Sequence, residues 1–122
     1  MTITSVAFFA YAVSDIKKAR KFYEGFLDLR PNGEYDKDPD SQYIEYDIAG
    51  TTVAIGCSDQ WLPSEKGASV ALEVDDFDAW VKKAKDAGVP IAMGPYDFPS
   101  CRMLVITDPD KNRVTLHKRS KK

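Results

Sequence analysis

Apolar and polar positions along the chain follow two spacings, one typical of strands and one typical of helices. Residues 3–13 and 67–74 alternate in the manner of strands with one covered face. Each segment is followed by a stretch in which apolar residues recur three and four positions apart, which predicts an amphipathic helix. The apolar stripe of the first helix consists of Ile16, Ala19, Phe22, Tyr23, Phe26 and Leu27, and that of the second consists of Phe77, Trp80, Val81 and Ala84.

Capping residues mark the ends of the predicted helices. Ser14 or Asp15 can begin the first helix, because a short side-chain oxygen accepts a hydrogen bond from an N–H of the first turn. The second helix begins at Asp75 and Asp76, where negative charge is favourable beside the positive end of the helix dipole. Gly88 is suited to end this helix, because glycine adopts a left-handed conformation at no steric cost.

Three short strands fit after each helix, separated by turn residues. They are expected at about 30–35, 42–48 and 51–57 in the first half, and at about 89–93, 101–107 and 112–118 in the second. Turns are expected at 49–50 and at 108–112. Each half is therefore predicted to form one strand, one helix and three further strands.

The two halves are related by an internal repeat. The sequence V-S-D-I at 13–16 recurs as V-D-D-F at 74–77, an offset of 61 residues, and twice this offset equals the full length of 122 residues. The strand and helix positions of both halves keep the same offset. We therefore expect a single domain over residues 1–122, with one module at about 1–57, a linker at 58–67 and a second module at about 68–122.

Composition and charge exclude several classes of protein. Hydrophobic residues make up 43% of the chain and charged residues 30%, as in ordinary globular proteins, and the net charge of −2 gives no basic surplus for binding nucleic acid. No apolar run approaches the ~20 residues of a membrane span, and the start lacks the basic region of a signal peptide. We expect a cytoplasmic protein that binds neither nucleic acid nor membranes, with Cys57 and Cys101 as free thiols.

The ordered motifs resemble a known family. They are Val13-Ser14-Asp15 followed by Phe22-Tyr23, then Leu72-Glu73-Val74-Asp75-Asp76, then Asp86-Ala87-Gly88-Val89, and finally Arg102 ahead of Asp108-Pro109-Asp110-Lys111-Asn112. In this order they are similar to the vicinal oxygen chelate superfamily, which contains glyoxalase I, bleomycin-resistance proteins, fosfomycin-resistance enzymes and extradiol dioxygenases. The resemblance implies an α+β fold in which two βαβββ modules form a cup-shaped mixed sheet, often in a homodimer.

The resemblance also locates the places where enzymatic members of the family hold a divalent metal on His, Gln or Glu. Motif spacing places these positions at Phe8, Ser69 and Thr115, and the 61-residue offset adds Ala54. Phenyl and methyl groups cannot ligate a metal, and neutral hydroxyls are poor ligands. We therefore expect no metal and no other cofactor.

Strand parity predicts which residues line the cup. Phe9 and Tyr11 are expected to face the helix, so that Phe8, Ala10 and Ala12 form an apolar cup floor together with Ala54. Small residues on this face leave room for a small apolar or amphipathic molecule. The alternative is that they let large neighbouring side chains pack closely.

Four further residues are candidates for ligand binding, each with an alternative. Glu73 faces the apolar cup, where its pKa would be raised and the carboxyl could act as an acid or base, or it is structural. His117, the only histidine, is a general base or a surface residue beside the basic C-terminal residues. Arg102 binds an anionic group of the ligand, or it pairs with another group of the protein in a structural role. Trp61 covers the cup or contacts the second subunit.

Three functions fit these residues. The first is metal-independent binding of a small molecule, for sequestration or resistance, as the resemblance to bleomycin-resistance proteins implies. The second is a metal-independent enzyme that uses Glu73 and His117. The third is a metalloenzyme of the glyoxalase or dioxygenase type, which the residues at the metal positions argue against. Nucleophile-elbow, phosphate-loop and dinucleotide-binding motifs do not occur in the sequence.

Overall fold

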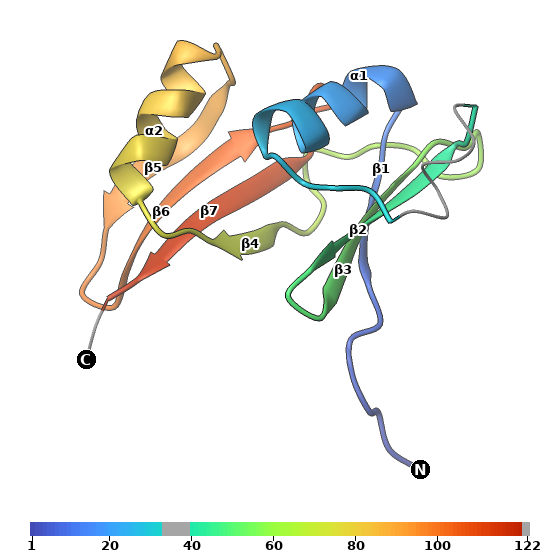
Figure 1. The fold of residues 1–122 in the computed structure, drawn as a ribbon, viewed down its shortest axis with the longest axis horizontal. Helices are drawn as coiled ribbons and strands as arrows, with labels where there is room; N and C mark the ends of the chain where they lie inside the picture. Colours follow the sequence, from blue (N-terminus) through green and yellow to red (C-terminus); the bar gives the residue numbers. More distant parts are fainter. Residues whose placement is uncertain (33–39, 121–122) are drawn as a thin grey trace. The chain divides into compact units, whose positions relative to one another are not determined.

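A computed structural model describes residues 1–32 and 40–120 of the chain. They form two compact units, Met1–Pro63 and Ser64–Lys122 (Figure 1). The boundary between the units falls inside the expected linker at 58–67. Each unit combines one β-sheet with a helical segment, so the fold class is α+β, as the sequence predicts.

The first unit contains a three-stranded sheet in the order β1-β3-β2. β1 runs parallel to β3, and β2 runs antiparallel to it. Its elements are β1 (Phe9–Ala12), α1 (Ile16–Arg20), the π-helix η1 (Lys21–Phe26), β2 (Tyr43–Ile48) and β3 (Thr51–Gly56).

The second unit contains a four-stranded sheet in the order β4-β7-β6-β5. Only the β4–β7 pair is parallel. Its elements are β4 (Val70–Glu73), α2 (Phe77–Asp86), β5 (Ile91–Asp97), β6 (Cys101–Thr107) and β7 (Arg113–Arg119). This unit has the complete predicted sequence of strand, helix and three strands.

The 61-residue repeat is present in the strand register itself. In the first unit Ala12 of β1 pairs with Gly56 of β3. In the second unit Glu73 of β4 pairs with His117 of β7, and both residues lie 61 positions further along the chain. The same holds for every paired residue of these two parallel ladders. Equivalent positions of the two halves therefore have equivalent neighbours.

The helices begin where the capping residues predict. Asp15 Oδ1 accepts a hydrogen bond from the Lys18 N–H at 3.1 Å, and Asp76 Oδ1 accepts one from the Ala79 N–H at 3.1 Å. Gly88 follows α2 in the left-handed conformation, with φ +69°. The second half of the first helix differs from expectation, because it widens into the π-helix η1.

Two predicted strands have different limits in the structure. The strand expected at 3–13 begins only at Phe9, which pairs with Val53 of β3. Because β3 starts at Thr51, two residues before Val53, residues 3–6 extend past its end, and residues 1–8 are exposed. The strand expected at about 30–35 is represented by a single bridge between Pro31 and Tyr46, and its residues from 33 onward lie outside the described ranges.

The turn at 108–112 is closed by buried side chains. Asp108 and Asn112 are almost fully buried. Asp108 Oδ1 accepts hydrogen bonds from the backbone N–H groups of Asp110 and Asn112, both at 2.9 Å, and Asp108 Oδ2 accepts one from the Asn112 side chain at 2.9 Å. Lys111 stands in the left-handed conformation, with φ +67°, where the resembling family usually has glycine. The most specific motif in the sequence is therefore a structural one.

Each sheet buries one face against its helix. In the first unit the ring of Tyr23 lies 6.0 Å from that of Tyr11 and 6.2 Å from that of Tyr46. In the second unit Leu104, Ile106 and Leu116 are fully buried on strands that contact α2. Burying a large aliphatic side chain stabilises a fold by roughly 1.5–3 kcal/mol. These faces form the cores, so ligand-binding groups are to be sought on the opposite faces.

Candidate functional site

The structure brings together Ser69 and Thr115, the two positions of the second unit that the resemblance assigns to a metal. Ser69 Oγ and Thr115 Oγ1 are 2.9 Å apart and share a hydrogen bond. Thr115 lies on β7 beside Ala71 of β4 and is buried. The two hydroxyls therefore hydrogen-bond to each other at positions that the resemblance assigns to metal ligands.

The two metal positions of the first unit differ from each other in burial. Ala54 lies on β3, pairs with Ala10 and is fully buried. Phe8 precedes β1, and 51% of its surface is exposed. Phe8 is therefore not part of the core, and its place in the floor of a cup stays a prediction.

The face of the first sheet opposite its helix is made of small residues, which we call the alanine face. It consists of Ala10, Ala12, Ala54 and Gly56, as strand parity predicts. Tyr43 and Glu45 of β2 pair with Gly56 and Ala54 and belong to the same face. The Tyr43 hydroxyl donates a hydrogen bond to Glu45 Oε2 at 2.9 Å, so a polar pair borders the small residues.

Trp61 of the linker lies over this face. A Cβ atom added to Gly56 would be 3.0 Å from Cζ3 of the Trp61 ring and 3.3 Å from Cδ1 of Tyr43. The Trp61 side chain remains 40% exposed. Of the two roles considered for Trp61, this contact supports a cover over the alanine face. At Gly56 itself the small residue lets neighbouring rings pack closely, which is the alternative to an open pocket.

Glu73 and His117 form a pair on the corresponding face of the second sheet. Glu73 Oε1 lies 2.6 Å from His117 Nδ1, and Glu73 Oε2 accepts a hydrogen bond from the Arg119 N–H at 2.7 Å. The Arg119 N–H and then His117 hold the pKa of the Glu73 carboxyl below its usual value. The expected upward shift is wrong, because the carboxylate is exposed and doubly hydrogen-bonded rather than enclosed by apolar groups.

Arg102 lies away from this pair, on the face of the second sheet that carries α2. Its Nε donates to Asp97 Oδ1 at 2.5 Å and its Nη1 donates to Asp78 Oδ1 at 3.0 Å. Its guanidinium carbon also lies 4.5 Å from the centre of the Phe77 ring. The hydrogen bond to Asp97, and then the one to Asp78, raise the pKa of Arg102. They support the structural alternative for Arg102.

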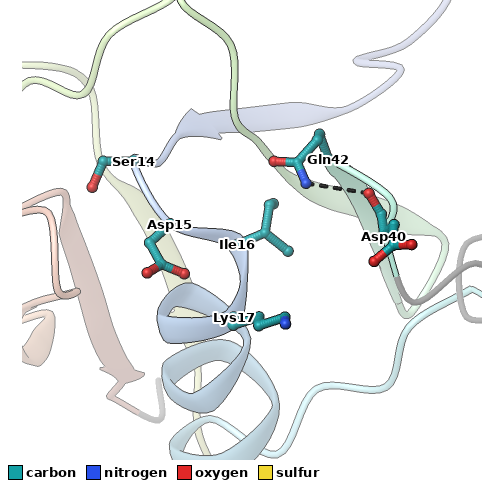
Figure 2. Close-up of a pocket in the computed structure, with 6 residues that line it drawn as sticks. All are labelled: Ser14, Asp15, Ile16, Lys17, Asp40 and Gln42. Atoms are coloured by element: carbon teal, nitrogen blue, oxygen red, sulfur yellow. Dashed lines mark hydrogen bonds between the residues drawn. The ribbon is translucent and has the colours of Figure 1, made fainter.

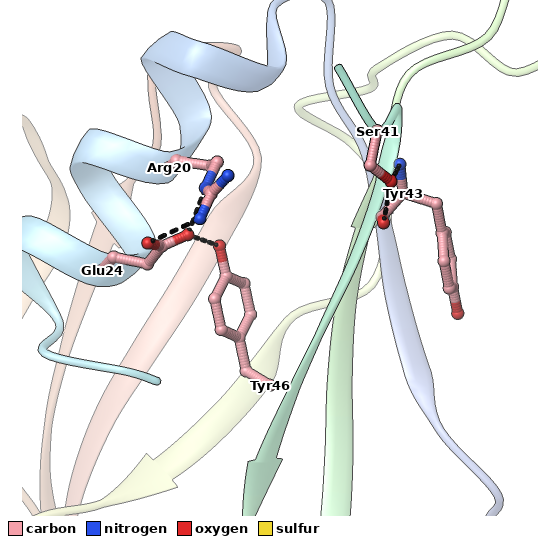
Figure 3. A network of polar contacts seen from close by, with 5 residues as sticks. All are labelled: Arg20, Glu24, Ser41, Tyr43 and Tyr46. Atoms are coloured by element: carbon pink, nitrogen blue, oxygen red, sulfur yellow. Dashed lines mark hydrogen bonds and ion pairs between the residues drawn. The ribbon is translucent and has the colours of Figure 1, made fainter. Parts of the chain in front are cut away.

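A second polar network joins helix and sheet in the first unit. Arg20 Nε donates to Glu24 Oε2 at 2.6 Å, and the Tyr46 hydroxyl donates to the same oxygen at 2.8 Å (Figure 3). Burial, and then the neighbouring Glu24 carboxylate, raise the pKa of Tyr46 far above its usual value. Tyr46 therefore remains neutral and holds the helix to β2, which is a core role.

The two units each carry a surface hollow. The hollow of the first unit has a volume of about 340 Å³ and lies beside the start of α1 (Figure 2). Its lining residues are Ser14, Asp15, Ile16, Lys17, Asp40 and Gln42. The hollow of the second unit has a volume of about 520 Å³, and we call it the thiol hollow. Its lining residues are Ser100, Cys101, His117, Arg119 and Ser120.

Sequence reasoning found His117 but did not connect it with Cys101. In the structure Cys101 of β6 pairs with Arg119 of β7, two residues from His117. Side chains directly opposite one another in an antiparallel pair lie on one face, so the thiol and the imidazole share a face. The only signal in the sequence was the predicted pairing of the last two strands, whose register could not be fixed without the structure.

The donor set at these four positions does not fit the metal centre that the resemblance implies. The four family positions offer a phenyl ring, a methyl group and two hydroxyls that bond to each other. Within residues 1–32 and 40–120, no three His, Cys, Asp or Glu side chains are grouped so that they could hold a metal ion. The same ranges contain no helix with the length and apolar character needed to cross a membrane.

Comparison with known proteins confirms the family. The family model described as glyoxalase/bleomycin resistance protein/dioxygenase superfamily matches residues 5–116. The chain belongs to this superfamily. Its match to the metallothiol transferase FosB of Staphylococcus epidermidis is 29% identical and covers 96% of this chain and 83% of that protein.

Solved structures of other proteins share the fold. TnmS3, an antibiotic-binding protein from Streptomyces sp. CB03234, superposes with a TM-score of 0.77 and 25% identity, covering 98% of this chain and 99% of that one. The fosfomycin resistance protein FosX of Mesorhizobium loti superposes with a TM-score of 0.72 and 21% identity, covering 98% and 95%. The fold of this chain is thus similar to those of proteins named for antibiotic binding and for fosfomycin resistance.

Proposed function

We propose that this superfamily member binds a small apolar or amphipathic molecule without a metal ion, in sequestration or resistance. The hydrogen bond between Ser69 and Thr115 carries the proposal. The hydroxyl groups of these two residues, at positions that the resemblance assigns to a metal, hydrogen-bond to each other. Neither hydroxyl ionises near neutral pH. A divalent ion at this point would gain two weak neutral ligands and would have to break their mutual hydrogen bond.

The alanine face is the binding surface that we propose. Small-molecule sites combine mostly apolar walls with a few orienting polar groups. Ala10 supplies a partly exposed apolar wall beside the buried Ala12 and Ala54, and the partly exposed Tyr43–Glu45 pair supplies a polar group beside it. The partly exposed Trp61 ring offers a plane against which a flat ligand can stack. The likeness to TnmS3, named as an antibiotic-binding protein, supports this choice.

Metal-independent catalysis is the second candidate function, and the Glu73–His117 pair favours it. A carboxylate 2.6 Å from one imidazole nitrogen orients the ring and leaves the other nitrogen available for proton transfer. A metalloenzyme of the glyoxalase or dioxygenase type is disfavoured by the unsuitable donors at the four family positions.

Metal analysis and a thermal-shift screen test the proposal. Purified protein should contain less than stoichiometric divalent metal, and its melting temperature should be unchanged by a chelator or by added Zn²⁺, Ni²⁺ or Mn²⁺. Planar aromatic antibiotics that bind should raise the melting temperature by mass action, with or without chelator. A matched control is Ser69→His combined with Thr115→Glu, which introduces two metal ligands at touching positions and should gain metal-dependent stabilisation. Stoichiometric metal in the unmodified protein would overturn the proposal.

Tryptophan fluorescence locates the ligand. The chain has two tryptophans, so Trp80→Phe leaves Trp61 as the only one and Trp61→Phe leaves Trp80. A ligand bound at the alanine face should change the emission of the Trp80→Phe variant and leave that of Trp61→Phe almost unchanged. The reverse pattern would place the ligand elsewhere.

A further inference from the structure

The thiol hollow lies at one end of the second sheet. Cys101 and Arg119 are directly paired across β6 and β7, and His117 pairs with Met103 on the adjacent rung of the same face. Diagonal neighbours of this kind have their Cα atoms about 7–8 Å apart, with Cβ atoms somewhat closer. A small molecule in the hollow of about 520 Å³ can therefore contact the Cys101 thiol and the His117 imidazole together.

The imidazole is held in one orientation. Glu73 Oε1 accepts from His117 Nδ1 at 2.6 Å, while the Arg119 N–H fixes the other carboxylate oxygen at 2.7 Å. With its proton on Nδ1, the ring presents Nε2 as a base, and the structure gives this nitrogen no protein partner among the described residues. A thiol, a base and a residue that orients the base are the parts needed to activate a cysteine. Glu73 acts through His117 and is a positioning residue.

The charges around the hollow favour an anionic ligand. Arg119 lines it, whereas none of its described lining residues is a carboxylate. The nearest such group, Glu73, already accepts hydrogen bonds from His117 and from the Arg119 backbone. At the rim of the hollow, the Ser120 N–H donates a hydrogen bond to the Ser100 carbonyl oxygen at 3.0 Å. An electrophile bearing a carboxylate could thus pair with Arg119 while its reactive carbon approaches Cys101.

We propose that Cys101 captures small α,β-unsaturated carbonyl compounds that carry a carboxylate, by conjugate addition. His117 Nε2 takes the thiol proton, the sulfur forms a bond to the β-carbon, and the carbon–carbon π pair moves onto the α-carbon and carbonyl oxygen. His117 then returns the proton to the α-carbon, which yields a thioether adduct that keeps its carboxylate and restores the neutral imidazole. The addition has no leaving group and needs no oxidant or metal, so one thiol and one proton-transferring base suffice.

This inference is independent of the proposed binding function, because it uses residues of the second unit alone. Cys57 is a control within the same molecule. It is the only other cysteine, its thiol donates to the Ser14 carbonyl oxygen at 3.5 Å, and the single histidine of the chain is His117 in the second unit. Both thiols are partly exposed, so exposure alone predicts similar reactivity.

Two probes test the proposal, N-ethylmaleimide and a maleimide that carries a butyrate group. Mass spectrometry of peptides from the full chain follows the modification of each cysteine at neutral pH. We expect Cys101 to react at least about tenfold faster than Cys57, and His117→Gln to remove this advantage. Arg119→Gln should abolish a preference of Cys101 for the carboxylate-bearing probe. Equal rates for the two cysteines in the unmodified protein would overturn the proposal without any variant.

Glu73→Gln tests the positioning role with a readout that unfolding cannot imitate. The variant should slow Cys101 and leave Cys57 unchanged, whereas loss of structure would expose and accelerate both thiols. Because the chain has one histidine, nitrogen NMR of the imidazole is unambiguous. We expect the neutral ring to carry its proton on Nδ1 in the unmodified protein and to lose this preference in Glu73→Gln. A proton on Nε2 in the unmodified protein would contradict the assignment of Nε2 as the base.

Discussion

Asp108 shows how much a single side chain can contribute to one turn. It accepts three hydrogen bonds at 2.9 Å, two from backbone N–H groups and one from the Asn112 side chain. Asp108→Ala would remove the carboxylate that accepts hydrogen bonds from two buried donors of Asn112, at about 1–3 kcal/mol for each. We expect the free energy of unfolding to fall by about 3 kcal/mol, measured by urea denaturation. Asp97→Ala is a control on an exposed carboxylate, and an equal loss there would show that the effect is not specific to the turn.

Glu73 should make stability depend on pH. Its pKa is lowered in the folded state by the Arg119 N–H and by His117, the two groups that hydrogen-bond its carboxylate. The ionised carboxyl therefore stabilises the fold above its unfolded pKa of about 4.3, and this contribution is lost as the pH falls through the folded pKa. The melting temperature should drop more steeply below about pH 4.5 in the unmodified protein than in Glu73→Gln. Parallel curves would contradict the lowered pKa.

At the residue scale, motif spacing selected Ser69 and Thr115, and the structure brings their hydroxyls to 2.9 Å from each other. That the two residues stand at metal positions of the family stays a prediction. The offset and strand parity also placed Glu73 and His117 on one face. The direction of the Glu73 pKa shift could not be predicted, since it depends on the Arg119 backbone N–H, which no side-chain pattern indicates. Cys101 was missed for a similar reason, because its neighbours follow from the register of β6 and β7.

At the scale of elements, the hydrophobic pattern predicted each helix and the central strands, because the pattern depends on which face is buried. Element ends depend on partner strands, and so the first strand is shorter than its alternation suggests. The π-helix η1 follows from a hydrogen bond of 2.9 Å between the Leu27 N–H and the Phe22 carbonyl oxygen. The apolar stripe of an α-helix and of a π-helix differ too little over six residues for the sequence to distinguish them.

The contact between the linker and β3 gives a test at the same scale. Gly56→Ala places a methyl group 3.0 Å from the Trp61 ring, so the partly exposed ring must move. In the Trp80→Phe background we expect the Trp61 emission to shift to longer wavelength, with a loss of about 1 kcal/mol in stability. Gly25→Ala is the matched control, because its Cβ would meet nothing within 4 Å. Unchanged emission in Gly56→Ala would contradict the position of Trp61 over the alanine face.

At the scale of the whole molecule, we predict a homodimer. The linker exposes the apolar residues Trp61 and Leu62, and the resemblance implies that family members often pair. Size-exclusion chromatography with light scattering should give close to twice the 13.6 kDa of one chain. Leu62→Asp should shift the mass toward one chain, and because Leu62 is 74% exposed, the core should be unaffected. A mass near 13.6 kDa for the unmodified protein would contradict the prediction.

The equivalence of the two strand registers has a consequence for the order of the units along the chain. Every described strand ladder lies within one unit, and the boundary between Pro63 and Ser64 interrupts none of them. A circular permutant that begins at Ser64 and joins the original ends through a flexible Gly/Ser linker keeps all of these ladders. It should unfold cooperatively and keep the far-ultraviolet circular dichroism of the parent, whereas a permutant opened between Val105 and Ile106 should not fold, since that cut divides β6. The fold would then be encoded in each copy of the repeat, and the order in which the copies are translated would be free to change.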